Sequence, residues 1–344
     1  MPPPDPAPAR VTNPLARLPD RRPGSVRRTS SLAIEPAGEW DNGTVVAGIA
    51  QDSVAGHADG TVTVLRIASV TATLDIGSRL TSVGGDLPAE VAAVLIGRSP
   101  VSGFRKELTR LAAAGLDPGS PQAAILDDLP TVRLISGYAR LIELPPPVAG
   151  GRAAAPVLNV CRGWAADSTA SRRTAAGQSV ITGTPPAPRF AELLGEAADG
   201  PLSGTAANVA EPPPRPRSMR RLRVLDVVRV GPDLEVYQYF RDSHIDAGGA
   251  EGSLHEYVMT ARLTAADLVL REISVEPRAL PFPECRLAAP NAHLLIGVPA
   301  AGIEGSVRSA LGGTMGCTHL NDVLRFLRFA ASLAAAAERA DPVN

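Results

Sequence analysis

Cysteines, aromatic residues, net charge and long apolar runs are all scarce in this chain of 344 residues. Three cysteines cannot form the disulfide framework of a small secreted protein. Aromatic residues make up 3% of the chain and the formal net charge is −1, which disfavours nucleic-acid binding. No run approaches the roughly 18 apolar residues of a membrane span. We therefore expect a cytoplasmic protein that binds neither nucleic acid nor membrane.

The composition is that of a globular protein long enough for two domains, since 44% of its residues are hydrophobic. Residues 1–26 are rich in Pro and Arg and are predicted to be a disordered tail. Residues 141–220 contain several Pro and Gly clusters, which indicate a linker. The segment Cys161–Trp164 interrupts this linker, and we expect it to dock onto a domain.

The same order of predicted strands and helices occurs on both sides of the linker, in residues 27–140 and in residues 221–340. In each, short β-branched runs precede apolar-periodic helical runs, which favours an α+β fold over βαβ alternation. Leu95–Gly97 matches Leu295–Gly297, and Ser120 stands opposite Cys317. We predict two related copies of an antiparallel sheet with helices on one face. Chance similarity between Ala- and Leu-rich helices is the alternative.

Two cysteines, Cys285 and Cys317, occupy positions that we expect to be exposed. Cys285 follows the last β-rich run, and Cys317 directly precedes the final helical run. Backbone N–H groups and the dipole at a helix N-terminus favour a thiolate, the reactive form of cysteine. Glycines at 312, 313 and 316 permit a tight turn toward the sheet. We therefore predict that the two thiols meet in space.

Two histidines complete this candidate site, and its donors suit zinc or iron. We predict His255, Cys285, Cys317 and His319 as the metal ligands. A second hypothesis is a thiol-dependent enzyme for a small acyl or carbonyl substrate, in which Cys317 is the nucleophile and His319 the base. A third is a non-catalytic interaction module whose duplicated sheets offer a binding surface to a small molecule or another protein. The alternative for Cys285 and Cys317 themselves is that both are buried thiols acting as small apolar fillers.

Other candidate residues carry weaker signals. His244 lies in a polar segment typical of a loop site, and Cys161 could be either functional or a packed anchor. The turn at 312–316 could hold an anion, although it lacks the Gly-Lys-Ser/Thr of a P-loop. Asp127 and Asp128 could act as a carboxylate pair or simply be solvated. His57 and His293 are expected to have no functional role.

Several segments together resemble one bacterial family, the domain of unknown function 2889. They are Arg27–Ser31, Leu95–Arg105, Leu126–Pro130, Leu134–Tyr138, Cys161–Trp164 and the block from His255 to Leu324. The resemblance implies no activity, since the family has none assigned.

The C-terminal half also resembles the iron–sulfur scaffold proteins of the U type, in its order of strand, turn, strand, Cys, helix, helix, Gly-Cys and helix. That resemblance implies ligand positions near His255, at Cys285 and at Cys317. The chain departs from the pattern in three ways. His255 stands where that family has a cysteine, Gly316 stands where it has a histidine, and its Leu-Pro-Pro-Val-Lys motif is absent.

Overall fold

The computed structural model describes residues 10–56, 61–101, 103–143, 158–181, 183–194 and 215–340. Its framework is one eight-stranded antiparallel sheet in the order β4-β3-β2-β1-β5-β6-β7-β8. The strands are β1 (Val26–Ala37), β2 (Glu39–Ala55), β3 (Val62–Leu74), β4 (Leu80–Gly85), β5 (Ser218–Val230), β6 (Asp233–Ile245), β7 (Glu251–Thr264) and β8 (Leu270–Ala279).

The two halves of the chain share this sheet, whereas we expected a separate sheet in each. Strand β1 pairs with β5 from Val26↔Val227 to Ile34↔Met219. Each is the first strand of its half and would otherwise be an edge with a row of unpaired backbone groups. Their pairing satisfies those groups and extends the sheet across both halves.

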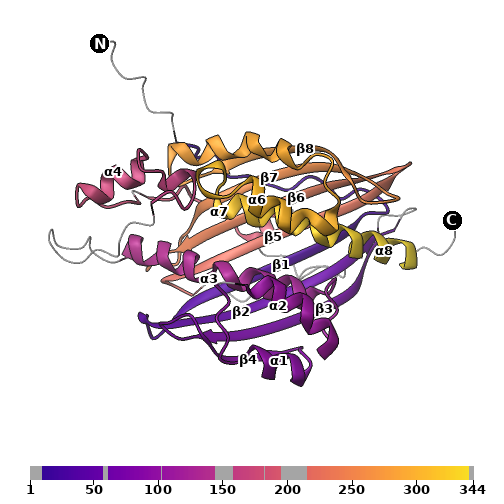
Figure 1. Cartoon of the computed structure of the whole chain (residues 1–344), viewed down its shortest axis with the longest axis horizontal. Coiled ribbons are helices and arrows are strands. Elements are labelled where there is room, and N and C mark those ends of the chain that lie inside the picture. Colours follow the sequence, from indigo (N-terminus) through magenta and orange to yellow (C-terminus); the bar gives the residue numbers. More distant parts are fainter. Residues whose placement is uncertain are drawn as a thin grey trace, which may run out of the picture.

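Helices cover one broad face of the sheet (Figure 1). The first half supplies α1 (Ala89–Leu95), α2 (Phe104–Arg110), η1 (Leu111–Ala114) and α3 (Pro121–Glu143). The second supplies η3 (Pro283–Leu295), η4 (Ala300–Gly302), α6 (Ile303–Ala310), η5 (Gly313–Met315), α7 (Thr318–Arg325), η6 (Phe326–Phe329) and α8 (Ala330–Ala340). Their apolar side chains and those of the strands form one continuous core. The prediction of an α+β fold with an antiparallel sheet is confirmed; the relation between the halves remains a prediction.

Helix α3 is longer than the sequence pattern predicts. The sequence pattern predicts a helix over residues 120–129, yet the helix runs from Pro121 to Glu143 with Pro130 inside it. The residues beyond Pro130 still carry a buried face, including Val132, Ile135 and Tyr138. Packing of that face against the sheet offsets the backbone hydrogen bond that a proline removes. Within the described residues, no helix is both long and apolar enough to cross a membrane.

The opposite face of the sheet carries a smaller core beneath the N-terminal segment and α5 (Phe190–Leu193). Leu18 is buried there, and its N–H donates to the carbonyl of Leu193 (2.7 Å). Thr12 also forms a bridge with Ala279 at the end of β8. Residues 10–25, which we expected to be disordered, therefore form part of the fold because they bury apolar side chains.

Charged residues lie in the layer between the sheet and the helices. Arg28, Arg221, Asp52 and Asp242 on the strands are all fully buried. Helices α3 and α7 add Asp127, Asp128 and Asp322, which are also buried. Asp127 accepts from Arg105 (2.9 Å), and Asp128 from Arg223 (2.6 Å). The two neighbouring aspartates are thus members of a buried ion-pair network and are not solvated.

Candidate metal centre

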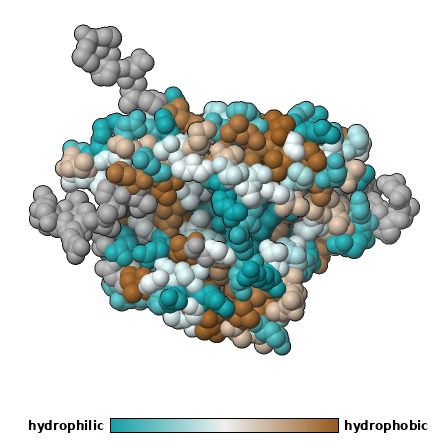
Figure 2. Space-filling model, viewed as in Figure 1, coloured by the Kyte–Doolittle hydropathy of each residue, from teal (hydrophilic) through white to brown (hydrophobic). Residues whose placement is uncertain are grey.

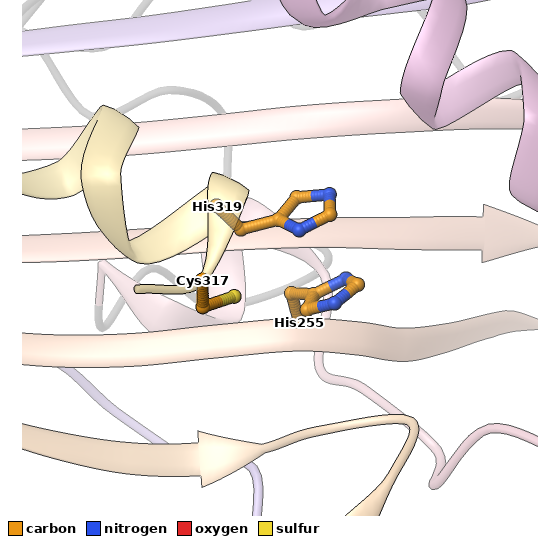
Figure 3. A group of neighbouring side chains, drawn as sticks. All are labelled: His255, Cys317 and His319. Carbon is orange, nitrogen blue, oxygen red and sulfur yellow. The ribbon is translucent and has the colours of Figure 1, made fainter. Parts of the chain in front are cut away.

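Three of the four predicted ligands come together where α7 begins above β7. His255 lies on β7, Cys317 is the N-cap of α7 and His319 is in its first turn. One potential ligand atom from each lies within 4.8 Å of the others, and all three side chains are buried. Figure 3 shows the Cys317 thiol and the His319 ring reaching from the start of the helix toward the strand that carries His255.

A glycine-rich turn places Cys317 above the strand. A Cβ on Gly316 would lie 2.2 Å from the carbonyl oxygen of Leu311, so only glycine fits. Gly313 has φ of 58°, in the left-handed region. On the helix that follows, Leu320, Val323 and Leu324 are completely buried, which anchors α7 against the core. The turn expected from the three glycines therefore forms.

The two histidines are stacked and neutral. Their ring centroids are 3.5 Å apart with an interplanar angle of 16°, and the Tyr138 ring lies edge-on to His255. Burial lowers the pKa of His319 to about 4 and holds that of His255 well below its usual value. His255 Nδ1 and His319 Nε2 are buried without a hydrogen-bond partner. Neutral imidazoles with free nitrogens are the form of histidine that binds metals.

Cys317 is neither exposed nor a thiolate, contrary to our expectation. Its exposed fraction is 1%, and burial raises the pKa of its thiol to about 12, with a smaller contribution from Cys161. Hydrogen bonds from Tyr257 and from the backbone N–H groups of Leu320 and His319 lower this pKa, as predicted for a helix N-terminus, but burial dominates. A buried, protonated thiol beside a neutral imidazole does not favour the predicted role as a nucleophile.

Cys285, the fourth predicted ligand, is outside this group but borders it. Like Cys317 it is buried, at 2% exposed, contrary to our expectation. A Cβ placed on Gly163 would lie 2.6 Å from the sulfur of Cys285 and 3.9 Å from that of Cys161. The Cys161–Trp164 segment docks here, since Arg162 N–H donates to the carbonyl of Gly316 (2.8 Å). All three thiols therefore surround the same part of the interior.

The close fit at Gly163 leads to a prediction about stability. Replacing Gly163 with alanine forces a methyl group against Cys285 and the Phe282 ring, so we expect the free energy of unfolding to fall by about 1–3 kcal/mol. Gly137→Ala is the matched control, because no atom lies within 4 Å of a Cβ there and alanine favours a helix by about 0.5–1 kcal/mol. Denaturant unfolding of both variants tests this, and equal effects would contradict the docking.

Sequence reasoning missed the polar residues around the centre. Asp242 Oδ2 lies 3.5 Å from His319 Nε2, and Arg221 binds both oxygens of Asp242. The Tyr257 hydroxyl donates to the sulfur of Cys317 (3.4 Å). No local signal indicated this burial, because Arg221 and Arg223 alternate with Leu222 and Val224, a pattern that predicts an exposed polar face.

The remaining histidines lie elsewhere. His244 is buried and its Nε2 lies 2.8 Å from Glu143 Oε1, so it joins a helix to the sheet. His293 is exposed, with Nδ1 near the carbonyl oxygen of Pro290 (2.7 Å). His57 falls outside the described residues.

Comparison with known proteins identifies similarity in the half that holds this centre. Residues 219–332 match the model of a family described as a protein of unknown function (DUF2889). The matched residues include His255, Cys317 and His319, and they run from β5 into α8. Neither the curated proteins nor the solved structures gave a match.

Proposed function

We propose that this protein binds a transition-metal ion, zinc or iron, at His255, Cys317 and His319. The observation that carries the proposal is the buried convergence of these donors, in which two imidazole nitrogens have no hydrogen-bond partner. Unpaired buried polar atoms are costly and call for an explanation, and an ion would satisfy them. Three protein ligands leave a fourth position open, as in catalytic zinc sites.

The protonation states define what binding requires. Both imidazoles are already neutral, so they need lose no proton. The Cys317 thiol must release its proton, which a bound divalent ion drives by stabilising the thiolate. Because the stacked rings lie in nearly parallel planes, their lone pairs do not converge on a point between them. Coordination of one ion by both imidazoles therefore requires one ring to rotate.

The first half offers an internal comparison. On β1 and β2, Arg28 binds both oxygens of Asp52, just as Arg221 on β5 binds both oxygens of Asp242 on β6. Each aspartate is followed by a serine at an irregularity in strand pairing. The partner of Asp52 on the next strand is Arg66, whereas the partner of Asp242 is His255.

This difference in charge supports a cation at the proposed centre. Arg66 places a second guanidinium on Asp52 at 2.7 Å. The corresponding His255 is neutral and supplies no second positive charge for Asp242. A metal ion held by His255 and its neighbours would occupy the place that the Arg66 guanidinium takes in the first half. Asp242 Oδ2 lies 3.5 Å from His319 Nε2, so its carboxylate would place a negative charge beside the ion.

We propose, as part of the same argument, that the two halves are copies of one duplicated unit. Gly97 N–H donates to the carbonyl of Leu80 (2.7 Å), and Gly297 N–H donates to that of Leu270 (2.8 Å). Both glycines end a Leu-Ile-Gly segment in the left-handed region. Under this proposal only the second copy has a metal centre. In the first copy, Ser120 takes the position of Cys317 and Arg66 takes that of His255.

Metal analysis tests the proposed function. We expect a single zinc or iron ion in the freshly purified protein, or after incubation with either metal, and its loss in Cys317→Ser and His255→Gln. Added Co²⁺ should give a thiolate-to-cobalt absorption band that is absent from Cys317→Ser. Acid-labile sulfide would distinguish an iron–sulfur cluster, implied by the resemblance to U-type scaffolds, from a single ion.

Two matched controls make this experiment decisive. Cys285→Ser removes a buried thiol outside the group, and His293→Gln removes an exposed histidine, so neither should change the metal content. Loss of metal in Cys285→Ser would restore the four-ligand set expected from the sequence. A wild-type protein that takes up no metal, or a folded Cys317→Ser variant that keeps it, would overturn the proposal.

A further inference from the structure

A separate feature lies on the surface, where the helices of the two halves meet. A cleft of about 140 Å³ opens between the start of α2, one side of α6 and the end of α7. Figure 2 shows hydrophilic side chains gathered at the centre of this face, where the helices of the two halves meet. Four cationic side chains line the cleft and only one carboxylate does, that of Glu304; the cations are Arg105, Lys106, Arg308 and Arg325.

Arg105 and Arg325 are the two largely buried cations of this cleft, and Arg325 is poorly paired. The Arg325 side chain is only 15% exposed, yet its ion pair with Asp322 Oδ1 is 3.5 Å long. Asp322 is already shared, because Arg105 approaches the same oxygen at 3.0 Å and Arg221 the other at 3.1 Å. Burial, and then the positive charge of Arg105, contribute to the lowered pKa of Arg325. A buried charge ordinarily has a close partner, and Arg325 has no carboxylate of its own.

The remaining charges of the cleft do not supply that partner. Glu304 faces Arg328, 3.9 Å away, and Asp127 beneath is shared between Arg105 and Arg328. Lys106 and Arg308 are exposed, and neither forms an ion pair within the described residues. The mouth of the cleft therefore carries an excess of positive charge from both halves of the chain.

We infer that this cleft binds a phosphate group. Guanidinium groups match phosphate oxygens in a planar, bidentate geometry, and the flexible Lys106 adds a point charge. The small volume admits a phosphate but excludes most of a larger ligand, so any organic part would lie outside the cleft. The inference is independent of the metal centre, because none of its residues is a proposed metal ligand.

Calorimetric titration with inorganic phosphate tests this inference, with chloride at matched ionic strength as the reference. We expect phosphate to bind the full-length protein, and the double variant Lys106→Ser/Arg308→Ser to bind at least about tenfold more weakly, since it lacks two charged hydrogen-bond donors. Arg271→Ser removes an exposed arginine on β8, outside the cleft, and should bind like the wild type.

A second ligand identifies the source of the phosphate group. Tighter binding of glycerol 3-phosphate than of inorganic phosphate would indicate a phosphomonoester, and the reverse would indicate the free ion. The substituted residues are exposed, so circular dichroism should show both variants folded. The inference is overturned if phosphate binds no better than chloride, or if the double variant binds phosphate as tightly as the wild type.

Discussion

Replacing Arg221 with methionine should reduce the free energy of unfolding by about 3–5 kcal/mol, the cost of removing one partner from a buried ion pair. The Arg221 side chain is completely buried on β5. It donates to both oxygens of Asp242 at 2.8 and 2.9 Å, to Asp128 at 2.7 Å and to Asp322 at 3.1 Å. Its loss leaves Asp242 without a cation among the described residues.

Two further variants test whether this loss of stability comes from the buried ion pairs of Arg221 and not from removing an arginine from β5. Arg229, also on β5, pairs with Glu338, but both side chains are more than half exposed, so Arg229→Met should cost less than about 1 kcal/mol. Adding Asp242→Asn to Arg221→Met should recover part of the loss, because it removes the unpaired charge. Denaturant unfolding measures all three variants. Similar midpoints for Arg221→Met and Arg229→Met would show that the buried network contributes little.

Acidification from about pH 6.5 to 4 should destabilise the metal-free protein. His319 has a pKa of about 4 in the folded chain against 6.5 when unfolded. Between these values the unfolded state binds a proton that the folded state does not, so stability falls as the pH falls from about 6.5 to 4. The shift corresponds to about 3 kcal/mol for His319. His255, whose pKa is also lowered by burial, acts in the same direction.

Other titratable groups also change the unfolding free energy in this pH range, so the contribution of the histidines has to be measured against a variant that lacks them. Burial raises the pKa of Glu256, which acts in the opposite direction within part of this range. His255→Gln/His319→Gln keeps Glu256 but lacks both imidazoles, so its unfolding free energy should depend much less on pH. Unfolding is followed by urea titration at several pH values in the presence of a chelator. Equal pH dependence of the wild type and the variant would show that the histidines are not buried in the neutral form.

Local signals predicted the parts of the fold that depend on neighbouring residues. Alternating β-branched runs predicted antiparallel hairpins, and the apolar stripe of α7 predicted its packing against the sheet. Helix α3 extends past the predicted residues 120–129 because the residues after Pro130 carry a buried face, whose packing offsets the hydrogen bond that the proline removes. The pairing of β1 with β5 joins residues about 190 positions apart, and no local pattern indicated it.

The candidate site divides in the same way. Residue type and helix position predicted His255, Cys317 and His319 as ligands of one metal site. The glycine-rich turn indicated how Cys317 would approach the strand. The same reasoning overestimated the reactivity of Cys317, because the helix N-terminus is a local effect whereas burial depends on every element packed around it. It also included Cys285, whose sulfur lies beside Gly163 of the docked segment.

The amino-acid sequence by itself therefore determined the kinds of element, the glycine-rich turn and the set of soft donor residues, because these depend on side-chain chemistry and short-range periodicity. Tertiary structure alone decided three other properties. It joined both halves in one sheet, it excluded water from the thiols and imidazoles so that they are neutral, and it gave His255 the place beside Asp242 that Arg66 takes beside Asp52. Solvation and charge pairing are set by residues distant in the sequence, so they appear only once the chain is folded.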